Sequence, residues 1–351
     1  MSEDVKRIVG SSPHIASPAT TRGIMTDVLI ALLPATVAGV VFFGAYALFN
    51  VLLCVGCCIL FEFLWNLARR TPQTIGDCSA AVTGLILGLN LPPAVPFYVG
   101  ILGSFFAIWL VKMLFGGLGK NFANPAATAR VFLLLSFTTV MTRYFISPID
   151  YAAGESWFNF NLFTYLPANL DGSVIDGFTH ATPLAEQTGL LNLFLGNTGG
   201  SIGETSAMCL LLGGVYLCIR RVIDWKIPVC VLASVALFTL IFSGDFAEVP
   251  YALLSGGVML GAIFMATDYS SSPNGRLAQV IYAVLIGFFT VFLRQFSSMP
   301  EGMSFAILLG NIVAPLLDKF LVPKPFGSVK KKREKRPPRA KREKKTKEAA
   351  E

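Results

Sequence analysis

Long apolar stretches recur along the chain and are separated by short polar segments. About ten of them approach or reach the roughly 20 residues that an α-helix needs to cross a bilayer. The third stretch is short and ends in Leu91-Pro92-Pro93, so we expect a broken or tilted helix there. The pattern predicts an all-α polytopic membrane protein with about ten transmembrane helices. The stretches are residues 26–44, 47–67, 77–93, 95–115, 124–143, 204–221, 227–244, 250–267, 276–294 and 302–322.

Charge adds to this picture mainly through its position. The chain has 351 residues and a net charge of +7, but residues 330–351 alone hold twelve Lys or Arg and four Glu, which is +8. The rest of the chain is then −1. Only 14% of residues are charged, against about 25% in an average soluble domain. This composition excludes a soluble globular enzyme and a basic nucleic-acid-binding domain. Basic tails of this kind bind anionic membrane lipids or the acidic surface of a partner.

Basic residues in short loops predict the orientation, because Lys and Arg accumulate on the cytoplasmic side. With a cytoplasmic N-terminus, the outer side has only Arg143 and Arg294. An even number of spans then returns the C-terminus to the cytoplasm. Residues 1–24 are polar, so no cleavable signal peptide is expected. The fourteen basic residues at the cytoplasmic ends and loops are Lys6, Arg7, Arg22, Arg69, Arg70, Lys112, Lys120, Arg130, Arg220, Arg221, Lys226, Arg276, Lys319 and Lys324.

One long polar segment interrupts the apolar pattern. Residues 144–203 contain no Lys or Arg, and the orientation places them outside the cytoplasm. A structureless loop of this length is unusual, so we expect a folded functional segment. The predicted organisation is a cytoplasmic N-terminal segment (1–25), five spans (26–143), this outer loop (144–203), five further spans (204–322) and a basic cytoplasmic tail (323–351).

The two sets of five spans show a weak likeness. Thr83-Gly84-Leu85-Ile86-Leu87-Gly88 in the third span has a counterpart, Gly256-Gly257-Val258-Met259-Leu260-Gly261, in the eighth. Both contain small residues four positions apart, which let helix backbones approach closely. Because five is an odd number, a second copy would be inserted upside down. We therefore predict two inverted five-helix repeats, and chance recurrence of small residues is the alternative.

Few side chains within the apolar stretches offer chemistry. Cys54 and Cys57 have the spacing of metal ligands, but they lie in mid-helix without acidic or His neighbours, which favours packing over a metal site. Glu62 is the deepest carboxylate. It either reaches the cytoplasmic face and pairs there, near Asn66 and Arg69, or lies on an ion path. The carboxylates expected at cytoplasmic span ends are Asp27, Asp77, Asp268 and Asp318.

A glycine-rich loop separates the fourth and fifth spans. Gly116, Gly117 and Gly119 precede Asn124-Pro125. Asn before Pro is a helix-start signal. The glycines favour either a loop that approaches a ligand closely or a tight helical hairpin, and the pattern does not separate these two interpretations.

The outer loop contains Asp176-Gly177-Phe178-Thr179-His180-Ala181-Thr182-Pro183. Its simplest interpretation is a helix start, with Thr182 as the N-cap and Pro183 as the first residue of a helix running through Leu191. The spacing Asp-x-x-Thr-x-Ala-Thr also resembles the flavinylation motif, in which the last Thr is esterified to the phosphate of FMN.

Other segments resemble the same family. Over residues 12 to about 322, the chain resembles the RnfD component of the Rnf complex, a family shared with the NqrB component of the Na⁺-translocating NADH:quinone oxidoreductase. The segments are Ser12-Pro13-His14, Thr21-Arg22, residues 24–35, Asp77-x-Ser79-Ala80-Ala81-Val82-Thr83-Gly84, Asn124-Pro125-Ala126 and Gly200-Ser201-Ile202-Gly203-Glu204-Thr205.

The resemblance implies a function and a cofactor. An Rnf complex couples electron flow between ferredoxin and NAD to Na⁺ or H⁺ movement across the bacterial cytoplasmic membrane. The implied partners are its iron–sulfur, flavin and membrane subunits. Thr182 matches the FMN-bearing residue, and Asp176 and Thr179 match the positions that a separate flavin transferase recognises. His180 departs from the commonest form of the motif.

The resemblance also implies features within the helices. Family members can hold riboflavin there, in addition to FMN. Gly116, Gly117 and Gly119 resemble a loop linked to quinone in the related enzyme, but Leu118 and Lys120 depart from that pattern.

The chain has no iron–sulfur spacing and no nucleotide-binding glycine motif, so we expect it to act only as part of a complex, carrying electrons through bound flavin. The alternative from another class is a cofactor-free secondary transporter built on inverted repeats. That protein would contain no flavin and would take up solute alone. A quinone-reducing subunit is a third interpretation.

Overall fold

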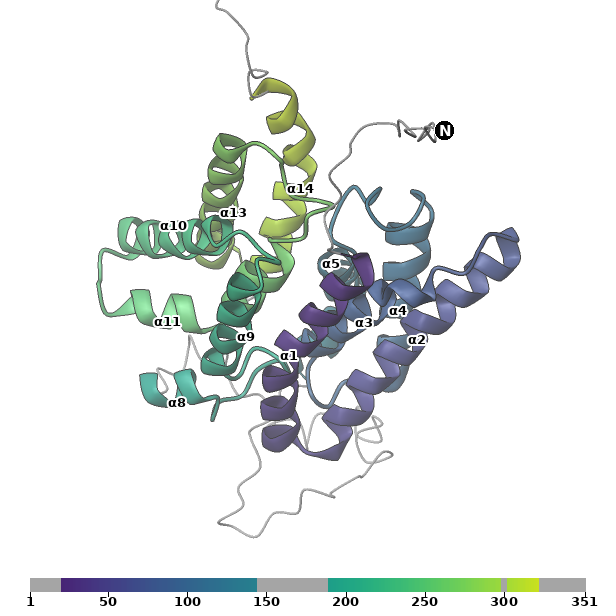
Figure 1. The fold of residues 1–351 in the computed structure, drawn as a ribbon. Coiled ribbons are helices and arrows are strands. Elements are labelled where there is room, and N and C mark those ends of the chain that lie inside the picture. The colour runs from purple at the N-terminus through teal and green to yellow at the C-terminus, as the bar shows by residue number, and fades with distance from the viewer. Residues whose placement is uncertain (1–19, 144–188, 298–301, 322–351) are drawn as a thin grey trace, which may run out of the picture. The chain divides into compact units, whose positions relative to one another are not determined.

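The computed structural model describes residues 20–143, 189–297 and 302–321 (Figure 1). These residues form helices joined by turns, with no strand among them, so the all-α prediction is confirmed for this part of the chain. The helices are α1 (Thr21–Phe43), α2 (Ala45–Arg69), η1 (Ile75–Asp77), α3 (Ser79–Leu89), α4 (Phe97–Phe105), η2 (Phe106–Met113), α5 (Pro125–Ser136), α6 (Thr138–Arg143), α8 (Leu190–Leu195), α9 (Ala207–Ile219), α10 (Lys226–Ser243), α11 (Glu248–Leu254), α12 (Val258–Leu260), η4 (Gly261–Met265), α13 (Arg276–Phe296) and α14 (Met303–Phe320).

Five of the described helices are long and apolar enough to cross a membrane: α1, α2, α10, α13 and α14. Helix α11 and the continuous pair α12–η4 make a sixth candidate span, bent by 60°. The helices at the other four predicted stretches are shorter: α3, α4–η2, α5 and α9. Large apolar side chains such as Leu33, Leu52 and Ile241 are exposed on the long helices. Contiguous exposed apolar surface marks a membrane-facing protein, and the chain is a membrane protein.

Local chemistry explains where several helices begin. The Thr20 hydroxyl accepts a hydrogen bond from the Gly23 N–H and caps α1. Gly44, with φ of 81°, separates α1 from α2. Asn124 caps α5 by accepting from the N–H groups of Ala126 and Ala127, and Pro125 is the first helical residue. The helix start predicted at Asn124-Pro125 is confirmed.

Helices from the first and second halves of the chain pack against each other. α1 lies against α9, and α5 lies against α14. Within the halves, α2 packs on α3 and α4, and α10 packs on α11 and α13. Gly84 permits the α2–α3 contact, because a Cβ there would lie only 2.7 Å from the Val55 Cα. The small residues predicted to allow close backbone approach therefore do so in α3.

Two predicted spans, the third and the eighth, are interrupted. α3 ends at Leu89 and is followed by a non-helical segment, where Pro93 and Val95 are buried. The side chain of Asn50 donates to the carbonyls of Pro93 (3.2 Å) and Val95 (3.1 Å). At the other break, Arg294 donates to the carbonyls that end α11, at 2.8–2.9 Å. Non-helical backbone inside a membrane protein persists where such donors satisfy it.

The eighth span differs from the sequence prediction. Residues 250–267 were expected to form one helix, but Ser255 to Gly257 break it. Gly257 has φ of 69°, and a Cβ at this position would overlap the carboxylate of Glu204. The residue taken as half of a small-residue helix contact is therefore at the helix break, where only glycine fits well.

Candidate functional site

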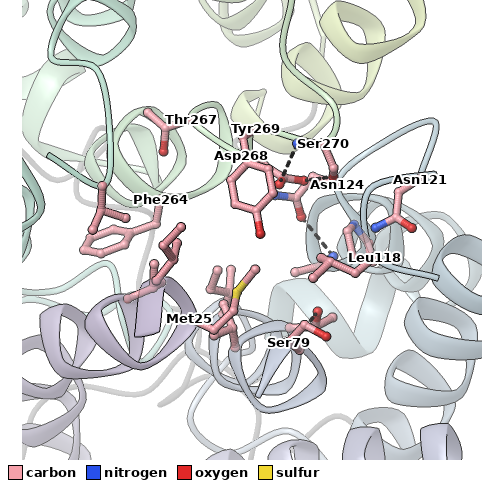
Figure 2. Close-up of a pocket in the computed structure, with 18 of the residues that line it drawn as sticks. Met25, Ser79, Leu118, Asn121, Asn124, Phe264, Thr267, Asp268, Tyr269 and Ser270 are labelled. Carbon is pink, nitrogen blue, oxygen red and sulfur yellow. Dashed lines mark hydrogen bonds between the residues drawn. The ribbon is translucent and has the colours of Figure 1, made fainter. Parts of the chain in front are cut away.

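A cavity of about 80 Å³ lies between the two halves of the described chain (Figure 2). Its walls come from α1, α3, the start of α5, the loop before α5, η4 and the turn that follows η4. One side is apolar, with Met25, Ile86 and Phe264, while Asn121 and Thr267 belong to its polar groups. An apolar cavity with a few polar groups is the usual form of a small-molecule site.

Two asparagines of the glycine-rich loop face this cavity. Asn124 donates to the carbonyl of Met265 (3.1 Å), which ties the start of α5 to the end of η4. The Oδ1 atom of Asn121 is buried and has no hydrogen-bond partner among the described residues. A buried acceptor without a partner is costly. Asn121 therefore supplies an acceptor that a bound donor would satisfy.

A carboxylate turn closes another side of the cavity. Asp268 accepts hydrogen bonds from the N–H (3.2 Å) and hydroxyl (2.9 Å) of Ser270 and from the Ser271 hydroxyl (3.1 Å). Burial raises the pKa of Asp268, and these hydrogen bonds oppose the rise. Burial also raises the pKa of Tyr269 to about 12, with the Asp268 charge adding to it. Asp268, Tyr269 and Ser270 all line the cavity (Figure 2).

A buried ion pair separates this cavity from a second one. Lys112 donates to the Glu62 carboxylate (2.6 Å) and to the Ser79 hydroxyl (2.6 Å). The Thr74 hydroxyl donates to the other oxygen of Glu62. Lys112 and Ser79 line the first cavity, whereas Glu62 and Thr74 line the second, of about 700 Å³. The pair therefore forms part of the wall between them.

A second buried pair joins the two halves. Arg130 on α5 lies 3.3 Å from the Glu204 carboxylate, and their side chains are 2% and 8% exposed. Arg130 also donates to the backbone carbonyl of Asn90 and to its Oδ1 (3.0 Å). Asn90 directly follows α3, and Glu204 precedes α9. Residues from three separate segments thus meet around one guanidinium.

These pairs correct two sequence predictions. Glu62 does not pair near Arg69 at a surface, because it is fully buried with Lys112, while Arg69 lies over the Trp65 ring at 5.1 Å. Lys112 and Arg130 were assigned to cytoplasmic ends, but both are buried. The part-buried Arg294 binds backbone carbonyls as well. Without these three residues the basic asymmetry is twelve against one, so the predicted orientation does not depend on them.

Other predicted residues have local roles. Asp27 on α1 accepts from Tyr216 (3.0 Å) and Arg220 on α9, and Asp318 accepts from the N–H of Asn274 (3.0 Å). Asp77 accepts from the N–H (2.8 Å) and hydroxyl (2.6 Å) of Ser79 and so caps α3. The described cysteines, Cys54 and Cys57 included, are free, and no group of three or more potential metal ligands occurs in the described ranges.

The glycine-rich loop contains a turn with positive φ at Gly116, Gly117 and Gly119. Gly116 and Gly117 line the second cavity, and Leu118 lines both. The tight turn and the close approach to a cavity therefore occur together in this loop.

The flavinylation motif lies outside the described residues. Asp176, Thr179 and Thr182 belong to residues 144–188, and the helix expected from Pro183 lies mostly there as well. Helix α8 begins at Leu190. The predicted role of Thr182 stays a prediction.

The sequence did not predict that three charged residues form buried ion pairs: Lys112, Arg130 and Glu204. Each was visible as a charge in or beside an apolar stretch, which is the signal that a buried partner exists. Their partners lie 50 and 74 positions away, and no local spacing identifies them.

Comparisons with known proteins agree with the resemblance of the sequence. Residues 8–327 match the model of the NQR2, RnfD, RnfE family. The D component of the Na⁺-translocating ferredoxin:NAD⁺ oxidoreductase complex of Acetobacterium woodii is 43% identical over 93% of this chain and 97% of its own length. The D component of the proton-translocating ferredoxin:NAD⁺ oxidoreductase complex of Clostridium ljungdahlii is 36% identical over 91% of this chain and 96% of its own. The D component of the ion-translocating oxidoreductase complex of Stutzerimonas stutzeri is 35% identical over 87% and 91%. The chain belongs to the NQR2, RnfD, RnfE family.

Proposed function

We propose that this chain is the membrane subunit of a redox-driven Na⁺ or H⁺ pump of the Rnf type and passes electrons through FMN bound covalently to Thr182. The names of its relatives support the complex. The observation that supports the flavin is the motif Asp176-x-x-Thr179-x-Ala181-Thr182 in the outer loop. The other Rnf subunits and a flavin transferase are its proposed partners. Neither the names of the relatives nor this motif supports a cofactor-free transporter.

The proposed setting is the bacterial cytoplasmic membrane, with both termini in the cytoplasm and residues 144–203 outside. The helix packing supports two inverted five-helix repeats. α1 and α9 open the two sets of spans, α5 and α14 close them, and each of these corresponding pairs packs together. Two interrupted spans at corresponding positions agree with this arrangement.

The cavity near Asn121 is the proposed place for a second, non-covalent flavin such as riboflavin. A flavin ring has an apolar benzenoid end and a polar end with donors and acceptors. The apolar wall with Met25 and Phe264 suits the first, and the unpaired Asn121 Oδ1 suits a ring N–H. When bound, the flavin would supply one-electron chemistry. Asn121 and Thr267 would orient it, and the apolar wall would exclude water.

Flavin analysis of the purified complex tests both positions. After coexpression with the transferase, the chain should show covalent flavin fluorescence on a denaturing gel, and Thr182→Ala should abolish it. Thr179→Val removes a motif hydroxyl but leaves Thr182 and should reduce the label. A label that persists in Thr182→Ala would refute the assignment.

Non-covalent flavin is measured separately, in the supernatant after acid precipitation. Asn121→Leu should lower it and leave the fluorescent band unchanged. Asn66→Leu, at a buried asparagine of the second cavity, is the matched control and should retain it. Equal release from both variants would contradict the proposed cavity.

A further inference from the structure

Arg130 and Asn90 each lie about one helical turn past residues that line the first cavity. The cavity is lined by Ile86 on α3 and by residues 124–126 on α5. Asn90 is one helical turn past Ile86, and Arg130 is about one turn past residue 126, or roughly 6 Å along either helix. Any passage from the cavity along these two helices would therefore meet the Arg130–Asn90–Glu204 contact first.

Backbone hydrogen bonds also join the two halves beside this contact. The N–H of Ile202 donates to the carbonyl of Leu91 (3.1 Å), and the N–H of Gly203 donates to the carbonyl of Leu89 (2.8 Å). The segment before Glu204 is thus hydrogen-bonded to the end of α3. Ile202 is fully buried, as are Leu89 and Leu91.

The oxygen atoms around Arg130 are those that a metal cation would use. Asn90 provides a backbone carbonyl and a side-chain carbonyl, and Glu204 provides a carboxylate. Carbonyls at the end of a half-helix, together with a carboxylate, bind alkali cations in transport proteins. Here the guanidinium fills the position instead, and Arg retains its charge at any working pH.

We propose that Arg130 acts as a built-in cation that makes the contact between the two halves a barrier to Na⁺ and H⁺, so that the pumped ion does not cross this chain between α3 and α5. A fixed Arg repels mobile cations, as in selective pores, and it occupies the oxygens that would replace their hydration shell. Glu204 offsets the cost of burying the charge. The inference rests on the proposed pump function only in that the barrier would keep ion movement coupled to electron transfer. The barrier itself needs no electron transfer.

Passive ion flux tests this barrier in the complete complex, reconstituted in liposomes without electron donor. A K⁺ diffusion potential drives ²²Na⁺ uptake, and an internal pH dye follows H⁺. Arg130→Gln should raise Na⁺ influx at least about tenfold, which corresponds to a barrier lower by about 1.4 kcal/mol. Arg130→Lys keeps the cation and should stay near the wild-type rate. Unchanged influx in an assembled Arg130→Gln complex overturns the proposal.

Two further variants complete the design. Arg220→Gln breaks another Arg–carboxylate contact between the halves, to Asp27, but this Arg side chain is 57% exposed. Its influx should equal wild type, and an equal rise in both variants would overturn a specific role for Arg130. If Arg130→Gln does not assemble, Arg130→Gln/Glu204→Gln removes both charges of the pair. Raised influx there supports the barrier and unchanged influx refutes it. The flavin label on Thr182 is scored separately, so failure of the pump assignment is distinguishable.

Discussion

Replacing Lys112 with Met should strongly destabilise the folded chain. Lys112 Nζ donates to Glu62 and to Ser79, and the side chains of Lys112 and Glu62 are 2% and 1% exposed. Lys112→Met would leave the Glu62 carboxylate buried with only the Thr74 hydroxyl as a donor. Removing one partner of a buried pair costs about 3–5 kcal/mol. Because one hydrogen bond to Glu62 remains, we expect a loss near 3 kcal/mol at the low end of that range.

The double variant Lys112→Met/Glu62→Leu separates the charge from the packing. It removes both members, and apolar replacement of a buried pair is often neutral or stabilising. Arg220→Met is the matched control, because it breaks an exposed pair that water screens and that contributes little to stability. Thermal unfolding of the detergent-solubilised chain can be followed with a thiol-reactive dye, since Cys54 and Cys58 are buried in the folded state. A Lys112→Met midpoint equal to wild type, or a double variant as unstable as the single one, would refute the reasoning.

Three further predictions use the same unfolding assay. Gly84→Ala should cost about 1–3 kcal/mol through overpacking, because its Cβ would lie 2.7 Å from the Val55 Cα. Gly56→Ala in α2 meets nothing within 4 Å and should be neutral or stabilising, so equal losses would contradict the packing argument. Asn50→Leu should cost about 1–3 kcal/mol, because the buried Pro93 carbonyl loses its Asn50 donor while the Val95 carbonyl keeps the Tyr46 hydroxyl, and a wild-type midpoint would contradict that. Burial raises the pKa of Asp268 above its ordinary value of 3.8. The stabilisation of the folded state by the protonated carboxyl is therefore fully present below pH 3.8 and is lost as the pH rises through the raised pKa. The unfolding midpoint of Asp268→Asn should therefore rise relative to that of the wild type as the pH increases. Parallel plots of midpoint against pH for the two proteins would contradict this.

Much of the local structure followed from the sequence. Long apolar stretches predicted helices, and a described helix occurs in each of those stretches, while α8 lies in the predicted outer loop. The start of α5 followed from Asn124-Pro125, since capping depends on residues only two or three positions apart. The short third helix followed from Leu91-Pro92-Pro93, because Pro does not continue a helix.

The break in the eighth span did not follow from the sequence, because its cause is not local. Gly256 and Gly257 fit a close helix contact and a turn equally well. What separates these interpretations is the Glu204 carboxylate beside Gly257 and the Arg294 donors to the Ser255 and Gly256 carbonyls. Arg294 is 38 positions from Gly256 and Glu204 is 53 positions from Gly257, so no window of local sequence contains both the glycines and their partners.

The same reason explains why the site was only partly predicted. Lys112 and Arg130 were counted as charges at the ends of spans, where snorkelling would place them. A charge inside a helix bundle needs a partner from another helix, and each of these residues has a carboxylate and a second oxygen group around it. The apolar stretches of this chain contain few charges. Each basic residue there can therefore be matched with a carboxylate in or beside another stretch before the charges of the loops are used to predict the orientation. Glu62 lies deep in the second stretch and Glu204 begins the sixth, so that rule would have directed attention to both buried pairs.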